Sequence, residues 1–244
     1  MRPILLITGA SAGIGAACAR LAAPTYDLAL NFRSDTTGAE AVAADAKAQG
    51  ARVLLCQGDV ANPADVARIF EQIDQTYGRL DALINNAGIV DQLATVAQMD
   101  HARLKRMFDV NVIGAMMVAQ AAAARMQAQG NGAIVNMGSI AARLGSANEF
   151  VDYAASKAAI DAFTKGLANE LAAQGIRVNA IRPGLIETEI HAKAGAPDRA
   201  QTLAKNIPMQ RVGTAAEVAS ATLFLLSDAA SYITGTTLDV SGGR

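Results

Sequence analysis

The sequence predicts an α/β fold in which a doubly wound, parallel sheet of seven strands carries helices on both faces. Short apolar runs, each the length of a buried strand, alternate along the chain with longer segments of helical period. Parallel strands need right-handed crossovers, which helices usually supply, so this alternation favours helices on both faces. With 244 residues, 52% of them hydrophobic, the chain suits one core, and residues 1–244 are expected to form a single domain.

Each expected element follows from a local pattern. The apolar runs that predict strands are Ile4–Thr8, Leu28–Phe32, Arg52–Gln57, Ala82–Asn85, Ala133–Met137, Arg177–Ile181 and Thr236–Val240. Helical period predicts helices over Ile14–Ala23, Thr37–Gln49, Ala64–Tyr77, a long segment Asp100–Gln129, Val151–Ala173 and Ala215–Leu226. Pro63 is typical of a first helical position, Gly50 and Gly175 close two helices, and Pro183-Gly184 stops the sixth strand.

One long stretch without regular period, Leu185–Gly213, follows the sixth strand. It contains Gly195, Pro197 and Pro208, and it is charged at several points. Long loops in compact domains usually cover or line binding sites. Residues 185–213 are therefore predicted to form a substrate-covering loop.

Composition argues against several classes of partner. The formal net charge is -1 and the isoelectric point is near 6.1, so no basic excess is available to bind nucleic acid. The two histidines, His101 and His191, are too few and too far apart to indicate a metal site, and metal-free chemistry is expected. No uninterrupted apolar run approaches the ~18 residues that span a bilayer, so no membrane partner is expected.

The cysteines and the first residues indicate a cytoplasmic protein. Cys18 and Cys56 lie within a predicted helix and a predicted strand, not in a closely spaced framework, which fits a reducing cytosol. Arg2 and the apolar stretch Ile4–Ile7 imitate the start of an export signal. The glycines that follow break that stretch, and a strand with a phosphate-binding turn explains the same residues better.

A glycine-rich turn, Gly9-Ala10-Ser11-Ala12-Gly13-Ile14-Gly15, connects the first strand to the first helix. At a helix N-terminus, free backbone N–H groups and the helix dipole attract an anionic pyrophosphate, and glycines let it approach. The turn therefore predicts a dinucleotide site that involves Gly9, Ser11, Gly13, Ile14 and Gly15. The alternative is a turn that only permits close packing of strand and helix, because the spacing differs from the common G-x-G-x-x-G pattern.

Two further segments lie at the carboxyl ends of predicted strands, where parallel sheets bind ligands. Asp59-Val60 follows the third strand, and Asn85-Asn86-Ala87-Gly88 ends the fourth. Asp59 could accept a hydrogen bond from the adenine amino group, although by itself it is typical of an ordinary turn. Together with the glycine-rich turn, these segments outline one dinucleotide crevice of a Rossmann fold.

A serine, a tyrosine and a lysine form the candidate catalytic group. Ser139 ends the fifth strand, and Tyr153 and Lys157 share one face of the next helix. A phenol with a pKa near 10 is a poor base at neutral pH, and a nearby ammonium lowers that pKa. We predict Tyr153 as the general acid or base, Lys157 as the group that lowers its pKa and holds the cofactor ribose, and Ser139 as the partner of the substrate oxygen. The alternative is a Tyr-Lys pair on the outer surface of an amphipathic helix.

With these motifs the chain resembles the classical short-chain dehydrogenase/reductases, in particular their glucose-dehydrogenase-like and 3-oxoacyl-reductase-like members. The resemblance implies hydride transfer between a nicotinamide dinucleotide and a small-molecule carbonyl or alcohol substrate. It also implies that Asn111 kinks its helix, fixes a water linked to Lys157 and completes an Asn-Ser-Tyr-Lys tetrad. The motifs that carry it run from Thr8-Gly9 through Asn85-Asn86-Ala87-Gly88, Asn111, Ser139, Tyr153, Lys157 and Pro183-Gly184 to Ser241-Gly242-Gly243.

The resemblance adds cofactor contacts and an assembly. It implies that the dinucleotide also meets Pro183, Gly184, Ile186 and Thr188, the last two at the nicotinamide carboxamide. A homotetramer of two-fold symmetry is expected, since the Ala119–Gln129 helix, the Tyr153 helix and the last strand carry small side chains that allow close approach.

The cofactor preference depends on the end of the second strand. Folds that select NAD present a carboxylate there to the ribose, whereas this chain has Phe32 followed by Arg33 and Ser34. Arg33 matches the family's phosphate-binding arginine, and Ser34 adds a hydroxyl donor. NADP(H) is therefore expected, with NAD(H) as the alternative, because Ala12 stands where many NADP-using members carry a basic residue.

The substrate stays open, and so does the direction of the reaction. The expected pocket is lined by Ile140, Arg143, Glu149, Phe150 and parts of Leu185–Met209, a mixture that suits polar or apolar carbonyls. A 3-oxoacyl thioester reductase is an alternative, weakened because regions that are basic in such members are uncharged here. A catalytically silent, dinucleotide-sensing regulator and an epimerase or dehydratase of the extended branch are further alternatives. The intact tetrad argues against the regulator.

Overall fold

A computed structural model describes residues 2–188 and 199–244. Within them, seven strands form one parallel sheet in the order β3-β2-β1-β4-β5-β6-β7. The order reverses between β1 and β4, so the ends of these strands open a crevice, and the doubly wound fold is confirmed. The strands are β1 (Ile4–Ile7), β2 (Asp27–Phe32), β3 (Val53–Gln57), β4 (Ala82–Asn85), β5 (Gly132–Met137), β6 (Ile176–Pro183) and β7 (Thr237–Val240).

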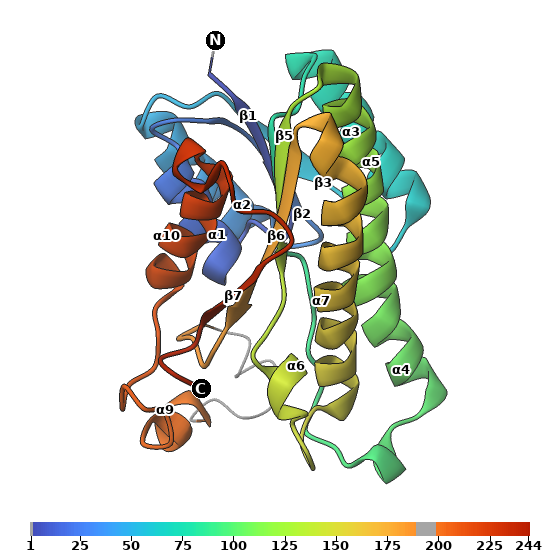
Figure 1. Cartoon of the computed structure of the whole chain (residues 1–244), viewed down its shortest axis with the longest axis vertical. Coiled ribbons are helices and arrows are strands. Elements are labelled where there is room, and N and C mark those ends of the chain that lie inside the picture. The colour runs from blue at the N-terminus through green and yellow to red at the C-terminus, as the bar shows by residue number, and fades with distance from the viewer. Residues whose placement is uncertain (1, 189–198) are drawn as a thin grey trace.

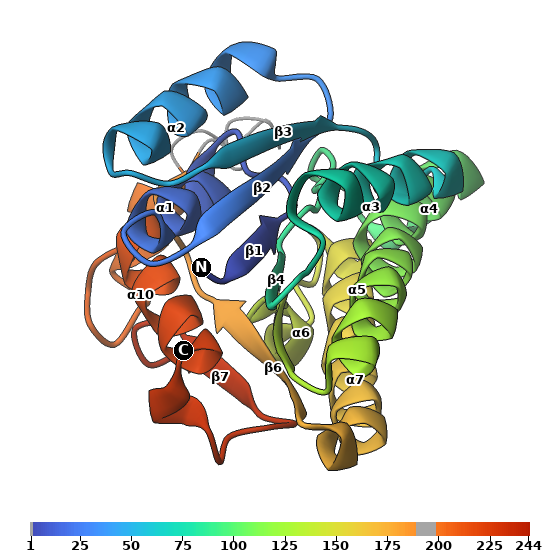
Figure 2. The same cartoon turned by 90° about the horizontal axis from the view of Figure 1, so that it is seen from above.

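Helices cover both faces of the sheet (Figures 1 and 2). One face carries α1 (Gly13–Ala22), α2 (Thr36–Ala48) and α10 (Ala215–Leu226), and the other carries α3 (Pro63–Tyr77), α5 (Ala115–Gln129) and α7 (Val151–Leu171). Shorter elements flank the carboxyl ends of the strands and the connections. They are α4 (His101–Phe108), α6 (Ala141–Leu144), α9 (Arg199–Ala204) and the 3-10 helices η1 (Val96–Gln98), η3 (Ala172–Gln174) and η4 (Asp228–Ala230).

Alternate residues of the strands build two apolar cores. In β1, Leu5 and Ile7 pack with the face that α1, α2 and α10 cover, while Ile4 and Leu6 pack with α3, α5 and α7. This period of two follows from the pleat of a strand, and all four residues are fully buried. A sheet with two apolar faces holds its strand ends rigidly, which places the candidate site residues.

The long segment predicted as one helix is interrupted. A π-helical turn, η2 (Asp109–Gly114), separates α4 from α5 and contains Asn111. Gly114 lets the turn approach the loop after β3, since a Cβ there would lie 2.8 Å from the Val60 carbonyl oxygen. By length and composition, His101–Gln129 could cross a membrane, but 56% of its most apolar window is buried within the fold.

The predicted covering loop, 185–213, is less irregular than its sequence suggests. Its later part contains α9, and Leu185 and Ile207 form a small buried cluster with Leu203 and Val212. Residues 189–198 of this segment lie outside the described residues. Its role in covering substrate therefore stays a prediction.

Candidate active site

A crevice of about 500 Å³ opens at the carboxyl ends of β1, β2 and β4, above the N-terminus of α1. The N-cap of α1 is Ala12, which offers no side-chain cap, and no acidic residue stands in the first turn. The first backbone N–H groups of the helix therefore lack a side-chain acceptor and face a cavity. This arrangement fits an anionic pyrophosphate, which those groups and the helix dipole would bind.

The three glycines of the turn serve different purposes. Gly9 and Gly13 have φ of +64° and +54°, which favours glycine at both positions. A Cβ on Gly13 would project across the crevice towards Thr188, 3.5 Å from its methyl group. A Cβ on Gly15 would lie 2.3 Å from the Gly9 carbonyl oxygen, so Gly15 permits the turn to close on itself and does not line the crevice.

Thr8, at the end of β1, ties the glycine-rich turn to the segment after β4. Its hydroxyl oxygen accepts hydrogen bonds from the backbone N–H groups of Asn86 and Ala87, both at 2.9 Å. The Asn86 amide donates back to the carbonyl oxygens of Thr8 and Gly9, at 2.9 and 3.1 Å. The two predicted segments are therefore one hydrogen-bonded unit.

The far end of the crevice holds the residues predicted for the adenosine part of the cofactor. Arg33 and Ser34 are exposed there, and Asp59 and Val60 line the same wall. The Asp59 carboxylate accepts from the backbone N–H of Ala61 at 2.9 Å and lies 3.9 Å from the Arg33 guanidinium. The Arg33 side chain is 62% exposed, so its guanidinium has room to meet a phosphate.

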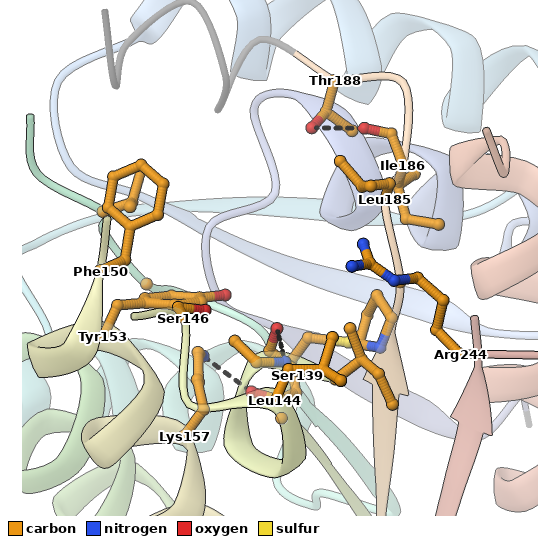
Figure 3. Close-up of a pocket in the computed structure, with 18 of the residues that line it drawn as sticks. Ser139, Leu144, Ser146, Phe150, Tyr153, Lys157, Leu185, Ile186, Thr188 and Arg244 are labelled. Carbon is orange, nitrogen blue, oxygen red and sulfur yellow. Dashed lines mark hydrogen bonds between the residues drawn. The ribbon is translucent and has the colours of Figure 1, made fainter. Parts of the chain in front are cut away.

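A second cavity of about 450 Å³ adjoins the crevice and contains Ser139, Tyr153 and Lys157 (Figure 3). Ser139 follows β5, and the other two project from the first two turns of α7. Ile14, Asn86, Gly88, Val90 and Thr188 line both cavities. The shared wall is where a dinucleotide in the crevice would meet a substrate beside Tyr153.

Lys157 lies beneath the Tyr153 ring and is held from below. Its Nζ donates to the Met137 carbonyl oxygen at 2.8 Å and lies 5.7 Å from the centroid of the tyrosine ring. Asn111 lines neither cavity, but its amide braces the wall behind Lys157. Its Oδ1 accepts from the backbone N–H of Ile89 at 2.8 Å, and its Nδ2 donates to the Ile89 carbonyl at 2.9 Å and to the Ser156 hydroxyl at 3.1 Å.

A buried ion pair fixes the start of α7. Arg103 of α4 donates to the Asp152 carboxylate at 2.7 Å, and the Asp152 side chain is fully buried. Asp152 also accepts from the backbone N–H of Tyr153. The pair joins α4 to the residue before the tyrosine and so anchors the turn of α7 from which Tyr153 projects.

Electrostatics at the tyrosine differ from the expectation. Burial raises the pKa of Tyr153, and a hydrogen bond with Ser139 acts in the opposite direction. The lowering predicted from Lys157 is not seen, because burial of the phenol outweighs it. Burial also lowers the pKa of Lys157 itself to about 8, opposed by Asp161. The prediction from sequence considered the positive charge of the lysine and not burial, whereas Lys157 is only 4% exposed. The phenol is therefore protonated at neutral pH in this structure.

Most predicted site residues line one of the two cavities, and a few lie elsewhere. Asn85 is in the core, where its amide donates to the Ala115 carbonyl at 2.8 Å and to Asn136 at 3.1 Å. Arg143 does not line the pocket and pairs with Asp239 at 2.6 Å. The predicted residues that do line a cavity are Gly9, Ser11, Gly13, Ile14, Arg33, Ser34, Asp59, Val60, Asn86, Ala87, Gly88, Ser139, Ile140, Glu149, Phe150, Tyr153, Lys157, Pro183, Gly184, Ile186 and Thr188.

Known proteins share this architecture over the whole chain. A family model described as enoyl-(acyl carrier protein) reductase matches residues 9–244. The uncharacterized oxidoreductase YgfF of Escherichia coli K12 is 46% identical over 99% of both chains. A solved short-chain type dehydrogenase/reductase from Mycobacterium marinum superposes with a TM-score of 0.93 at 33% identity, covering 98% of this chain and 94% of that one.

The chain belongs to the short-chain dehydrogenase/reductase family. Members of this family are oxidoreductases that bind a nicotinamide dinucleotide. Another similar structure, a 3-ketoacyl-(acyl-carrier-protein) reductase from Brucella melitensis, was solved with NADH. It has a TM-score of 0.92 at 32% identity and covers 99% of this chain and 98% of its own.

Three positioning groups of this short-chain dehydrogenase/reductase were not predicted as such. The Thr8 hydroxyl, the Ser156 hydroxyl and the Arg103–Asp152 pair each hold a predicted residue in place. A hydroxyl at the end of a buried strand is a signal that could have identified Thr8, because a buried hydroxyl needs a partner. The other two depend on contacts over 45 and 49 residues, for which the local sequence carries no signal.

Proposed function

We propose that this protein is an NADP(H)-preferring carbonyl reductase or alcohol dehydrogenase that works through Asn111, Ser139, Tyr153 and Lys157. The observation that carries the proposal is the cavity in which Ser139 and Tyr153 meet Lys157 at the wall of the dinucleotide crevice. A phenol beside a strand-end hydroxyl is a donor pair for an oxygen on which charge develops. An ion-binding or purely structural role would not need this pair inside a cavity.

Each side chain has a task in carbonyl reduction. When bound, the reduced nicotinamide supplies a hydride to the carbonyl carbon. Ser139 donates to the substrate oxygen and orients it, and Tyr153 gives that oxygen its proton, or takes the proton back in alcohol oxidation. Lys157 fixes the phenol from below, and Asn111 holds Ile89 and the Gly88 segment against Lys157. Because burial raises the pKa of Tyr153, the phenol of the free protein carries the proton that carbonyl reduction needs.

The preference for NADP(H) is supported by the wall at the end of β2. The buried Phe32 stands where a carboxylate would repel a 2'-phosphate, and the exposed Arg33 and Ser34 follow it. Asp35 lies in the same wall, but its carboxylate accepts from the backbone N–H of Gly38 at 3.0 Å as the N-cap of α2. NAD(H) is the second candidate cofactor, because the Brucella relative binds NADH.

Two wider properties belong to the proposal. Cytoplasmic location is supported by Cys18 and Cys56, which are free and buried on separate elements. A homotetramer is supported by the exposed Leu238 on the edge strand β7 and by the exposed Ile113 at the start of the α5 layer. Light scattering at micromolar concentration tests the assembly, and a monomer would contradict it.

A substrate panel tests the reaction. Purified protein is mixed with NADPH or NADH and with ketones, keto sugars, aldehydes and 3-oxoacyl thioesters, and loss of reduced nicotinamide is followed. Turnover of a free carbonyl compound with NADPH is expected. Turnover of thioesters alone would favour the 3-oxoacyl reductase instead, a candidate supported by the Brucella relative. Tight cofactor binding without any turnover would favour a silent dinucleotide sensor.

A further inference from the structure

A second cation faces the cavity that contains Ser139, Tyr153 and Lys157, which we call the catalytic cavity. Among the described residues that line it, Lys157 and Arg244 carry a basic group, and Lys157 is engaged with the Met137 carbonyl beneath the tyrosine. Figure 3 shows the guanidinium of Arg244 pointing into the cavity from the wall opposite Tyr153. The proposed reduction of a simple ketone gives this group no task.

Three other arginines at this end of the sheet form ion pairs, whereas none is found for Arg244 among the described residues. Arg143 meets Asp239 at 2.6 Å, Arg182 meets Asp161 at 2.9 Å, and Arg211 meets Glu217 at 2.5 Å. No carboxylate in residues 2–188 or 199–244 lies within 4.0 Å of the Arg244 guanidinium, which is half-buried. A half-buried cation beside an open cavity is a ready partner for an anion.

The backbone presents Arg244 to the cavity in a fixed way. Gly242 and Gly243 have φ of +66° and +96°. A Cβ on Gly242 would lie 2.8 Å from the Ile207 side chain, and a Cβ on Gly243 would lie 3.0 Å from Pro208. The backbone N–H of Met209 donates to the Gly242 carbonyl at 3.1 Å. The Ser241 hydroxyl donates to the main-chain oxygen of Arg244 at 2.9 Å. The turn that leads to the arginine is therefore packed and hydrogen-bonded.

We propose that Arg244 binds a carboxylate of the substrate, so that the substrate is a small oxo or hydroxy carboxylic acid. The inference rests on the proposed function, because it takes Ser139 and Tyr153 as the place of the carbonyl. A planar guanidinium matches a carboxylate with two parallel hydrogen bonds. Leu144, Phe150 and Leu185 supply apolar lining for a short hydrocarbon between the two polar ends.

The reaction leaves the bound carboxylate unchanged. A hydride passes from the reduced nicotinamide to the ketone carbon, the C=O π bond breaks, and the oxygen takes the Tyr153 proton. The products are the hydroxy acid and the oxidised nicotinamide, and Tyr153 regains its proton from solvent. Since Arg244 touches a group remote from the reacting carbon, it contributes equally to ground and transition states, and its effect falls mainly on KM.

Matched substrate pairs test the inference. 4-Oxopentanoate, 5-oxohexanoate and 6-oxoheptanoate are each compared with their methyl esters, since a length series finds the span between the two polar ends. At least one acid is expected to exceed its ester in kcat/KM by about tenfold or more, as for a charge-assisted hydrogen bond. Arg244→Gln should bring that ratio near one by raising KM for the acid alone, and Arg244→Lys should restore part of it. Arg143→Gln, which removes an arginine outside the cavity, should leave the ratio unchanged.

A binding measurement separates this inference from the proposed function. Hexanoate and methyl hexanoate are titrated into the NADPH-bound protein by calorimetry, which needs no turnover. Tighter binding of the acid, lost by about tenfold in Arg244→Gln, supports the carboxylate site even if no ketone is reduced. Acid and ester of equal affinity, or an acid preference that survives in Arg244→Gln, would overturn the inference and leave a carbonyl reductase without this specificity.

Discussion

The dinucleotide crevice and the catalytic cavity share a wall but are built from different parts of the chain. The crevice depends on main-chain N–H groups and on absent side chains, at Gly9, Gly13 and the uncapped start of α1. The cavity depends on polar side chains, of which Ser139 and Lys157 are more than nine-tenths buried. The comparison teaches that substitutions which add atoms should damage the crevice, whereas substitutions which remove a polar group should damage the cavity.

The largest expected effect is on turnover, from the cavity alone. Tyr153→Phe removes the transferable proton and keeps the ring, so kcat should fall about 10³-fold. The affinity for NADPH, measured by nucleotide fluorescence, should stay within about twofold, because no crevice atom is lost. A variant that keeps most of its kcat would show that Tyr153 is not the acid or base.

Adding one methyl group tests the crevice. Gly15→Ala places a Cβ 2.3 Å from the Gly9 carbonyl oxygen and should lower the free energy of unfolding by about 3 kcal/mol and weaken NADPH binding. Gly166→Ala is the matched control, because nothing lies within 4 Å of its Cβ in α7, and it should stabilise the protein by about 0.5–1 kcal/mol. Equal thermal midpoints for the two variants would contradict the prediction that added atoms are harmful at the glycine-rich turn.

The buried Lys157 should make the free energy of unfolding of the protein depend on pH. Burial lowers the pKa of Lys157 from its ordinary value of 10.5 to about 8, so between these pH values the unfolded chain binds more protons than the folded one. Stability relative to Lys157→Met should therefore rise as pH rises through this window, by on the order of 2 kcal/mol, and the cost of burial is complete below pH 8. Urea unfolding of both proteins at pH 7.5, 8.5 and 9.5 measures the difference, which should narrow with pH. If the difference in unfolding free energy between the two proteins stayed constant with pH, the pKa of Lys157 would be that of a solvated lysine and the prediction would be wrong.

The smallest effect expected is on the choice of cofactor. Arg33→Ala should lower kcat/KM with NADPH about tenfold, through loss of one charge-assisted hydrogen bond, and leave kcat/KM with NADH unchanged. Arg20→Ala, an exposed arginine paired with Asp45 away from the crevice, is the control. If wild type uses both cofactors equally, or if the Arg33 variant loses nothing with NADPH, the preference is absent.

The sequence predicted what local patterns determine. Strand positions agree with the structure to within two residues, because buried runs and their glycine or proline ends are local signals. The sequence could not predict which of Asn85 and Asn86 faces the crevice. Neighbouring residues in a strand point to opposite faces, and the apolar run Ala82–Asn85 is too short to show which face each residue takes. Asn85 faces the core and Asn86 the crevice. Arg143, which was expected to line the pocket, pairs with Asp239 instead. Arg244, which the sequence analysis did not name, lines the cavity, because only the folded chain brings residue 244 near α6 and α7.

The turn η2 imposes a condition on the number of residues, not only on their kinds. An α-helix advances by about 100° per residue, so the extra residue of a π-helical turn rotates everything after it. Removing one residue from Asp109–Gly114 would restore an ordinary helix, yet Val118, Ala119 and Ala122 of α5 would turn off the sheet that now buries them. The segment should therefore reject a single deletion, so that natural or engineered length variation is expected outside residues 101–129.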